Sequence, residues 1–348
     1  PQDYEQAVFW YRKAAEQGNA TAQTNLGYMY RQGYGVVKDY EQAVSWFRKA
    51  AEQGNALAQD YLGYMYQRGD GIVKDYDQAV SWYRKAAEQG NAMAQFNLGY
   101  MYDEGFGVVK DYEQAVFWYR KAAEQGSAMA QFNLGVKYEK GFGVVKDYDQ
   151  AVFWYRKAAE QGSAKAQFNL GLMYDEVYDV EKDYEQAVYW YRKAAVQGDA
   201  RAQTSLGYMY RHGWGIEKDY NQAVYWYRKA AKQGYAMAQN NLGSMYDEGY
   251  GVVKDYDQAV YWYRKSAEHG YAEAQYNLGY MYRHGWGIEK DYNQAVYWYR
   301  KAAKQGYAMA QNNLGYMYRQ GWGVKKDYDH AVYWFRKAAR QGNELAQN

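Results

Sequence analysis

The chain has 348 residues, 42 of them basic and 40 acidic, so its formal net charge is only +2. This balance argues against a nucleic-acid-binding protein, which needs a basic stripe to displace the counterions of the phosphate backbone. The chain contains no Cys, which excludes disulfides, a thiol nucleophile and Cys-ligated zinc within it. No apolar run approaches the roughly 18 residues that a membrane-spanning helix needs.

The dominant feature of the sequence is a repeat of fixed length. Asp-Tyr pairs recur every 36 residues without insertion or deletion, starting at Asp3, Asp39, Asp75, Asp111, Asp147, Asp183, Asp219, Asp255, Asp291 and Asp327. Repeats of this length indicate a solenoid, in which each module packs only against its neighbours. We therefore expect residues 1–348 to form a single array of about nine helix pairs, with a partial repeat at each end.

The segment 39–54, DYEQAVSWFRKAAEQG, predicts one helix of the repeat, which we name helix B. Asp39 precedes the helical pattern and Gln42 follows three residues later, as in a capping box. Gly54 can adopt the left-handed conformation that ends a helix. Helical spacing places five apolar residues on one face: Ala43, Trp46, Phe47, Ala50 and Ala51.

The segment 56–68, ALAQDYLGYMYQR, predicts the second helix, helix A, with Asn55 as its cap. Its expected buried face consists of Ala58, Leu62, Met65 and Tyr66. Gly63 lies in mid-helix, where glycine costs about 1 kcal/mol relative to Ala. The same glycine occurs in every complete copy, so we expect a neighbouring helix to approach closely there.

The spacing A-x-x-x-L-G-x-x-Y-x-x-G-x-G-V-x-x-D-x-x-x-A-x-x-W-Y-x-K-A-A-x-x-G resembles the Sel-1-like repeat, a relative of the tetratricopeptide repeat, over essentially the whole chain. One copy carries the pattern at Leu98-Gly99, Tyr102, Gly105, Gly107-Val108, Ala115, Trp118-Tyr119, Ala122-Ala123 and Gly126. The resemblance implies an all-α, right-handed superhelical α-solenoid of antiparallel helix pairs. It also implies a non-enzymatic adaptor for proteins or peptides, and suggests a bacterial exported or periplasmic location.

In the frame of that family, helix A opens each repeat. The chain would then start with an unpaired helix B over residues 3–17 and end with the beginning of a helix A over residues 344–348. Repeat arrays usually need polar caps at their ends, and neither end resembles one. We therefore expect fraying at the termini or end-to-end self-association.

Positions that vary between copies are the candidates for binding. On helix A, the positions equivalent to 57, 60, 61, 64 and 68 share the face that lines the concave groove in related folds. Three successive copies have Phe at position 60, which predicts an exposed apolar patch for a peptide ligand. The alternative is that these Phe pack between neighbouring A helices. The patch comprises Met93, Phe96, Tyr100, Met129, Phe132, Phe168 and Leu172.

Position 61 is Asn in most copies, and an amide both donates and accepts hydrogen bonds. A row of amides along the groove would suit the backbone of an extended peptide, although local bonds to adjacent turns are equally consistent with the pattern. The predicted contacts are Asn97, Asn133, Asn169, Asn241, Asn277 and Asn313.

An aromatic series marks the outward side of helix B, with Tyr in the last five copies. It suggests carbohydrate or cell-wall binding as an alternative function, or else packing in the seam against Arg three residues later, as in Tyr225 and Arg228. Trp214, Trp286 and Trp322 in the loops are expected to fill seams. The series is Phe9, Ser45, Ser81, Phe117, Phe153, Tyr189, Tyr225, Tyr261, Tyr297 and Tyr333.

No catalytic or metal-binding constellation stands out, so we expect no enzyme activity, no metal and no cofactor. The four His show no ligand spacing, and almost every polar residue is repeated many times. One copy departs from the pattern, with Val177 and Asp179 where the others have the two turn glycines. We expect an irregular junction at residues 175–182, since a β-branched residue is strained in a left-handed conformation.

Overall fold

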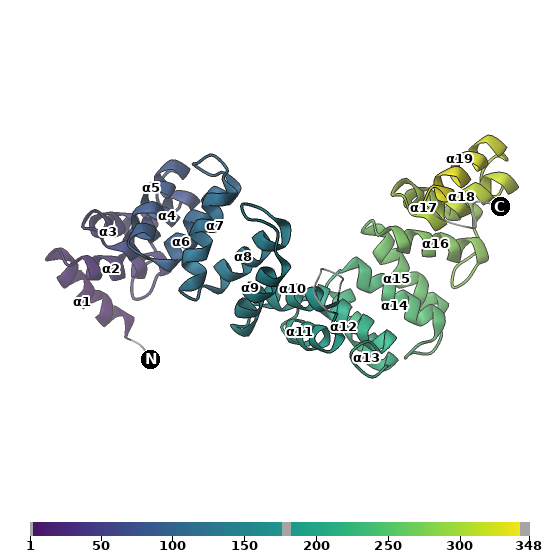
Figure 1. The fold of residues 1–348 in the computed structure, drawn as a ribbon, viewed down its shortest axis with the longest axis horizontal. Helices are drawn as coiled ribbons and strands as arrows, with labels where there is room; N and C mark the ends of the chain where they lie inside the picture. The colour runs from purple at the N-terminus through teal and green to yellow at the C-terminus, as the bar shows by residue number, and fades with distance from the viewer. Residues whose placement is uncertain (1–2, 176–181, 342–348) are drawn as a thin grey trace. The chain divides into compact units, whose positions relative to one another are not determined.

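The computed structural model describes residues 3–175 and 182–341, and all regular secondary structure in these ranges is helical (Figure 1). This confirms the all-α class and the alternation of two helices per repeat. The B helices are the odd-numbered ones: α1 (Tyr4–Glu16), α3 (Tyr40–Glu52), α5 (Tyr76–Glu88), α7 (Tyr112–Glu124), α9 (Tyr148–Glu160), α11 (Tyr184–Val196), α13 (Tyr220–Lys232), α15 (Tyr256–Glu268), α17 (Tyr292–Lys304) and α19 (Tyr328–Ala339).

The A helices are the even-numbered ones, and all of them except α10 are seen to pack most extensively against the B helix that follows. They are α2 (Ala20–Gln32), α4 (Ala56–Arg68), α6 (Ala92–Glu104), α8 (Ala128–Lys140), α10 (Ala164–Asp175), α12 (Ala200–His212), α14 (Ala236–Glu248), α16 (Ala272–His284) and α18 (Ala308–Gln320).

Backbone contacts divide the chain into two compact units, with the division between Leu170 and Gly171 inside α10. The first unit contains α1 to α9 and the start of α10, and the second contains the end of α10 and α11 to α19. Within each unit the helix pairs follow one another in chain order (Figure 1). The predicted irregular junction at Val177 and Asp179 lies outside the described residues.

The helix ends match the predicted capping chemistry. The Asp39 carboxylate accepts a hydrogen bond of 2.9 Å from the backbone N–H of Gln42, and the Asn55 side chain accepts one of 2.9 Å from Ala58. Gly69 ends α4 in the left-handed conformation, with φ of 78°. These contacts satisfy donors and acceptors that a helix end otherwise leaves unpaired.

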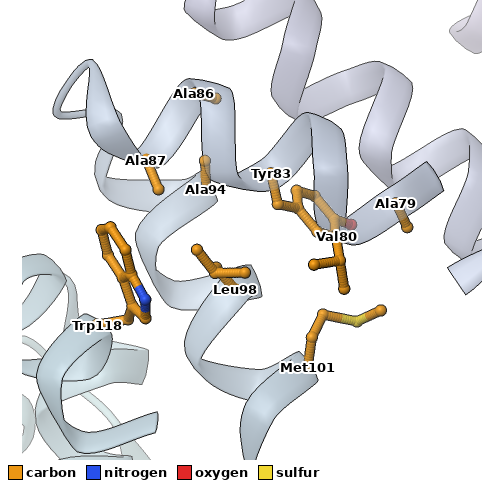
Figure 2. Packing of buried hydrophobic residues seen from close by; sticks show 9 residues of the cluster. All are labelled: Ala79, Val80, Tyr83, Ala86, Ala87, Ala94, Leu98, Met101 and Trp118. Atoms are coloured by element: carbon orange, nitrogen blue, oxygen red, sulfur yellow. The ribbon is translucent and has the colours of Figure 1, made fainter. Parts of the chain in front are cut away.

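Each repeat has its own small core, shown for α5 and α6 in Figure 2. Tyr83, Leu98 and Met101 are fully buried there, and Trp118 from the next B helix closes the cluster. The same contribution recurs in other core clusters, from Trp82, Trp154 and Trp262, and this is how a solenoid buries a continuous core. Trp10, on the first helix of the chain, is 60% exposed.

The mid-helix glycine is explained by the close approach that the sequence predicted. A Cβ on Gly99 would lie 2.8 Å from the ring of Tyr119 and 3.2 Å from the carbonyl oxygen of Ala115. The second loop glycine joins repeats instead: Gly107, with φ of 64°, packs directly against the backbone carbonyl of Tyr76 in the preceding B helix. A side chain at either position would push helices apart.

The abundant tyrosines also have structural positions. Arg84 on a B helix donates a hydrogen bond of 2.9 Å to the hydroxyl of Tyr102 on the next A helix. Tyr76 stacks on the loop aromatic Phe106, with ring centroids 4.9 Å apart. The same pairs recur along the array, so much of the 20% aromatic content serves packing.

Candidate functional site

The A helices expose one row of variable side chains, which we call the A face. The second residue is exposed on three A helices of the first unit: Leu57 on α4 is 43% exposed, Met93 on α6 is 46% exposed and Met129 on α8 is 49% exposed. These three residues occupy equivalent positions on successive helices of the first unit, and we call them the apolar row. The second unit has mixed residues there, namely Arg201, Met237, Glu273 and Met309.

The three phenylalanines do not form the exposed patch that the sequence predicted. Phe168 is buried, and Phe96 and Phe132 are half-buried. The ring of Phe96 lies 5.8 Å from that of Tyr119, and Phe132 lies 5.8 Å from Tyr155. Position 60 therefore points into the space between helices, and packing, the alternative left open by the sequence, is favoured. Tyr100 and Leu172, also predicted to line the patch, are half-buried.

The predicted asparagines are half-buried, and several bond to neighbouring repeats. Asn97 donates a hydrogen bond of 2.9 Å to the Asp60 carboxylate, and Asn277 donates one of 3.0 Å to Asn240. This confirms that inter-repeat bonding uses part of their capacity, and the peptide contact stays a prediction. Asn133, Asn169, Asn241 and Asn313 have the same intermediate exposure.

Asp60, which accepts the bond from Asn97, is an acidic residue that is only 4% exposed. Burial raises its pKa to about 6, although the hydrogen bond from Asn97 and the charge of Arg31 both oppose the shift. Desolvation disfavours the charged form of a carboxyl group. The charge of Asp60 therefore changes near neutral pH.

A ladder of buried glutamines joins the repeats, and our sequence reasoning missed it. Gln95 on α6 donates to the carbonyl of Ala87 at 3.1 Å and accepts a bond of 2.8 Å from Gln125 at the end of α7. Equivalent Gln–Gln bonds occur in both units. His269 replaces the second glutamine in one copy, with Nδ1 3.2 Å from the side-chain oxygen of Gln239. The signal was a Gln at position 59 in every copy.

Lys137 is a second feature that sequence reasoning missed. It is 5% exposed and occupies the core position that is Met101 in the preceding A helix. Its ammonium pairs with the carboxylate of Asp103 and lies 4.5 Å from the ring centroid of Tyr112. Tyr119 also donates a bond of 3.2 Å to Asp103. A buried charge needs such compensation, so this cluster is structural.

The aromatic series on the B helices remains accessible, and its predicted partner was wrong. Tyr225 is 47% exposed, and Lys229, four residues later, lies with Nζ 4.8 Å from its ring centroid. Arg228 instead donates a bond of 3.1 Å to the hydroxyl of Tyr246. The same Lys–aromatic contact recurs along the B helices, whose outward side we call the B face.

The loop tryptophans fill seams, as expected. Trp214 stacks on Tyr184 of the preceding repeat with centroids 5.3 Å apart, and Trp286 stacks on Tyr256 at the same distance. Both keep more than a third of their surface exposed. Their position nevertheless repeats that of Phe106, which indicates a packing role.

In residues 3–175 and 182–341, no three His, Cys, Asp or Glu side chains lie close enough to hold a metal ion. Across the same ranges, no helix has the length and apolar character needed to cross a bilayer.

The comparisons with known proteins agree with this architecture. A family model described as Sel1 repeat matches ten consecutive segments: residues 1–19, 20–55, 56–91, 92–127, 128–163, 164–199, 200–235, 236–271, 272–307 and 308–343. The crystal structure of c5321, a protective antigen present in uropathogenic Escherichia coli strains that displays an SLR fold, is 44% identical with a TM-score of 0.93. That match covers 100% of this chain and 74% of the other.

A Sel1 repeat protein from Oxalobacter formigenes is 38% identical, with a TM-score of 0.71 over 87% of this chain and 88% of its own. No curated protein matches the chain. The matched repeats together span residues 1–343.

Proposed function

The chain belongs to the Sel1 repeat family, and on that premise we propose that it binds a protein or peptide segment along the A face of its first unit. Proteins of this family are generally interaction scaffolds and typically not enzymes. Beyond this general role, we assign the contact to the A face of the first unit and expect it to be apolar. It rests on one observation, the apolar row of Leu57, Met93 and Met129.

The apolar row differs from its surroundings in a way that packing does not require. Each of its side chains is more than 40% exposed, whereas the core residues Leu62 and Leu98 on the same helices are fully buried. Burying such side chains against a ligand is favourable, and the flexible thioether of Met adapts to partners of different shape. Apolar residues exposed at equivalent positions of successive helices are typical of interaction surfaces.

Two asparagines beside the apolar row would orient the ligand through hydrogen bonds. Asn97 and Asn133 follow Met93 and Met129 by one turn on the same helices. The bond from Asn97 to Asp60 uses one of its amide hydrogens, and the amide carries a second hydrogen and an acceptor oxygen. Phe96 and Phe132 pack between the helices, so we do not expect them to contact the ligand.

The test is selection of peptides from a random library displayed on phage, using the full chain as bait. We expect enriched sequences with apolar anchors, and loss of their binding when Leu57, Met93 and Met129 are all changed to Ser. The matched control changes Met237 and Met309 to Ser in the second unit. Peptides that bind both variants equally would contradict the proposed site, provided that circular dichroism shows both variants folded.

End-to-end self-association stays a prediction. A hollow of about 430 Å³, lined by residues including Tyr4, Tyr11 and Tyr28, lies at the first helix pair, and Trp10 on the first helix is exposed. Sedimentation at increasing protein concentration would reveal association, and we expect Trp10→Lys to reduce it. A single monomeric species across the range of protein concentrations would contradict end-to-end self-association.

A further inference from the structure

The B face of the second unit combines exposed tyrosines with an excess of basic side chains. Tyrosines stand at equivalent positions of five successive B helices, each between 47% and 49% exposed: Tyr189, Tyr225, Tyr261, Tyr297 and Tyr333. Each has a Lys four residues later with Nζ between 4.7 Å and 5.3 Å from the ring centroid. The hydroxyl and the ammonium therefore form a repeated pair of donors at the surface.

Two helices of this face, α13 and α17, differ in charge from the equivalent helices of the first unit, whereas α15, with Asp257 and Glu268, keeps the neutral pattern. Helices α3, α5, α7 and α9 each carry two acidic and two basic side chains, all exposed. Helix α13 carries three basic residues, Arg228, Lys229 and Lys232, and no acidic one, and α17 repeats this arrangement. The acidic positions of α7, Glu113 and Glu124, correspond to Asn221 and Lys232 in α13.

From this charge complementarity we propose that the B face of α11 to α19 is a docking surface for an acidic protein segment, rich in Asp and Glu. Carboxylates accept hydrogen bonds from tyrosine hydroxyls and pair with lysine ammonium groups. Tyrosine is enriched at protein interfaces because it offers a rigid ring together with a polar tip. This surface is separate from the apolar row, so it does not depend on the function proposed above.

The geometry favours a protein over a carbohydrate. A sugar would have to stack on the face of a tyrosine ring, and a lysine ammonium already lies over that ring at Tyr225 and Tyr297. The accessible chemistry is therefore the phenolic edge and the positive charge. The series also presents these groups once per repeat, which allows several weak contacts with one extended segment to add together.

The chain supplies its own matched variants for a test, because the first unit shows which residues the fold accepts. In the loss variant, Asn221→Glu, Lys232→Glu, Asn293→Glu and Lys304→Glu give α13 and α17 the charges of α7. In the hydroxyl variant, Tyr225→Phe and Tyr297→Phe copy Phe117 and Phe153. The gain variant places the reverse changes on α7 and α9: Glu113→Asn, Glu124→Lys, Asp149→Asn, Glu160→Lys, Phe117→Tyr and Phe153→Tyr.

Binding of fluorescent poly-glutamate to the full chain is the measurement, by anisotropy at low and high ionic strength. We expect salt-sensitive binding that weakens at least about tenfold in the loss variant, less in the hydroxyl variant, and strengthens in the gain variant. Equal binding by the original chain and the loss variant would overturn the proposal. So would binding to phosphatidylglycerol vesicles or to alginate without binding to poly-glutamate, since these would assign the face to a membrane or an acidic polysaccharide.

Discussion

The two units are built from the same core but differ in what they expose. On the A face, the first unit has Leu57, Met93 and Met129 in succession, whereas the second unit alternates Met with charged residues. On the B face, the helices of the first unit are neutral, whereas α13 and α17 of the second are strongly basic. The two units therefore share their packing and differ in the side chains that they expose. Three sets of substitutions test how similar the interiors of the two units are.

The largest expected effect concerns the core that both units share. Gly99→Val in the first unit and Gly243→Val in the second should each destabilise the local helix pair by about 3 kcal/mol or more, because a Cβ at either position would lie within 2.8 Å of a tyrosine ring. Hydrogen exchange of the affected helices is the measurement, because long arrays need not unfold as one unit.

Gly126→Ala is the control for this prediction. Gly126 has φ of 94°, but a Cβ there would meet nothing within 4 Å. Only backbone strain of about 1–2 kcal/mol is then expected. A small effect of only one of the two changes, Gly99→Val or Gly243→Val, would mean that the two cores differ.

The next effect depends on pH and compares Asp60 in the first unit with Asn240, its equivalent in the second. Asp60 bonds to Asn97 as Asn240 bonds to Asn277, so Asp60→Asn should convert one arrangement into the other. The pKa of Asp60 is about 6 in the folded chain and 3.8 in the reference state, so the folded form holds the proton more tightly. Its contribution to stability is therefore present at low pH and is lost as pH rises through 6.

We expect the Asp60→Asn variant to exceed the parent in stability by about 3 kcal/mol at pH 8, and the difference to vanish below about pH 4. Urea unfolding across this pH range, followed by hydrogen exchange of α4 and α6, is the measurement. Parallel stability curves for variant and parent would show that Asp60 ionises normally. Asn240→Asp should produce the reverse change in the second unit.

The smallest effect concerns the buried lysine. Lys137 pairs with Asp103, whereas the second unit has Met281 at the position of Lys137 and Asp247 at that of Asp103. Removing one partner of a fully buried ion pair is usually costly because the other charge is left unpaired. The Asp103 side chain is 16% exposed and keeps its hydrogen bond from Tyr119, and the second unit already combines Met281 with Asp247, so Lys137→Met should change stability by no more than about 1 kcal/mol. Thermal unfolding measures this change. A loss well beyond 1 kcal/mol would show that the first unit depends on the lysine.

The sequence was sufficient to predict the helices, their caps and the close approach at Gly63, because periodicity and capping are local properties. It was not sufficient to orient position 60, since the neighbouring repeat decides which side of helix A is covered. One signal was nevertheless available. Position 60 never contains Lys, Arg or Glu, whereas position 57 includes Lys165, Arg201 and Glu273. A position that tolerates long charged side chains is exposed, and that contrast points to the apolar row.

The partner of the B-face aromatics was misassigned for a similar reason. Lys and Arg are adjacent in every B helix, and both lie within reach of a ring one turn earlier. Arg228 is drawn to the hydroxyl of Tyr246 on another helix, which no pattern within helix B reveals. Contacts between repeats, including the glutamine ladder, are the part of the site that required coordinates.

The joint at Gly107 and Tyr76 has a consequence for how the array changes over generations. Because the other joints in the described residues use the same Gly–Tyr contact, a block of repeats can be copied by recombination and inserted with its new junctions already compatible. Residues 206–243 and 278–315 are identical, as such a copying event would leave them. The copied block contains α13, whose duplicate is α17, so one event doubled the most basic helix of the chain. In this architecture, adding repeats also adds copies of the same surface groups, so that more of them can contact one ligand together.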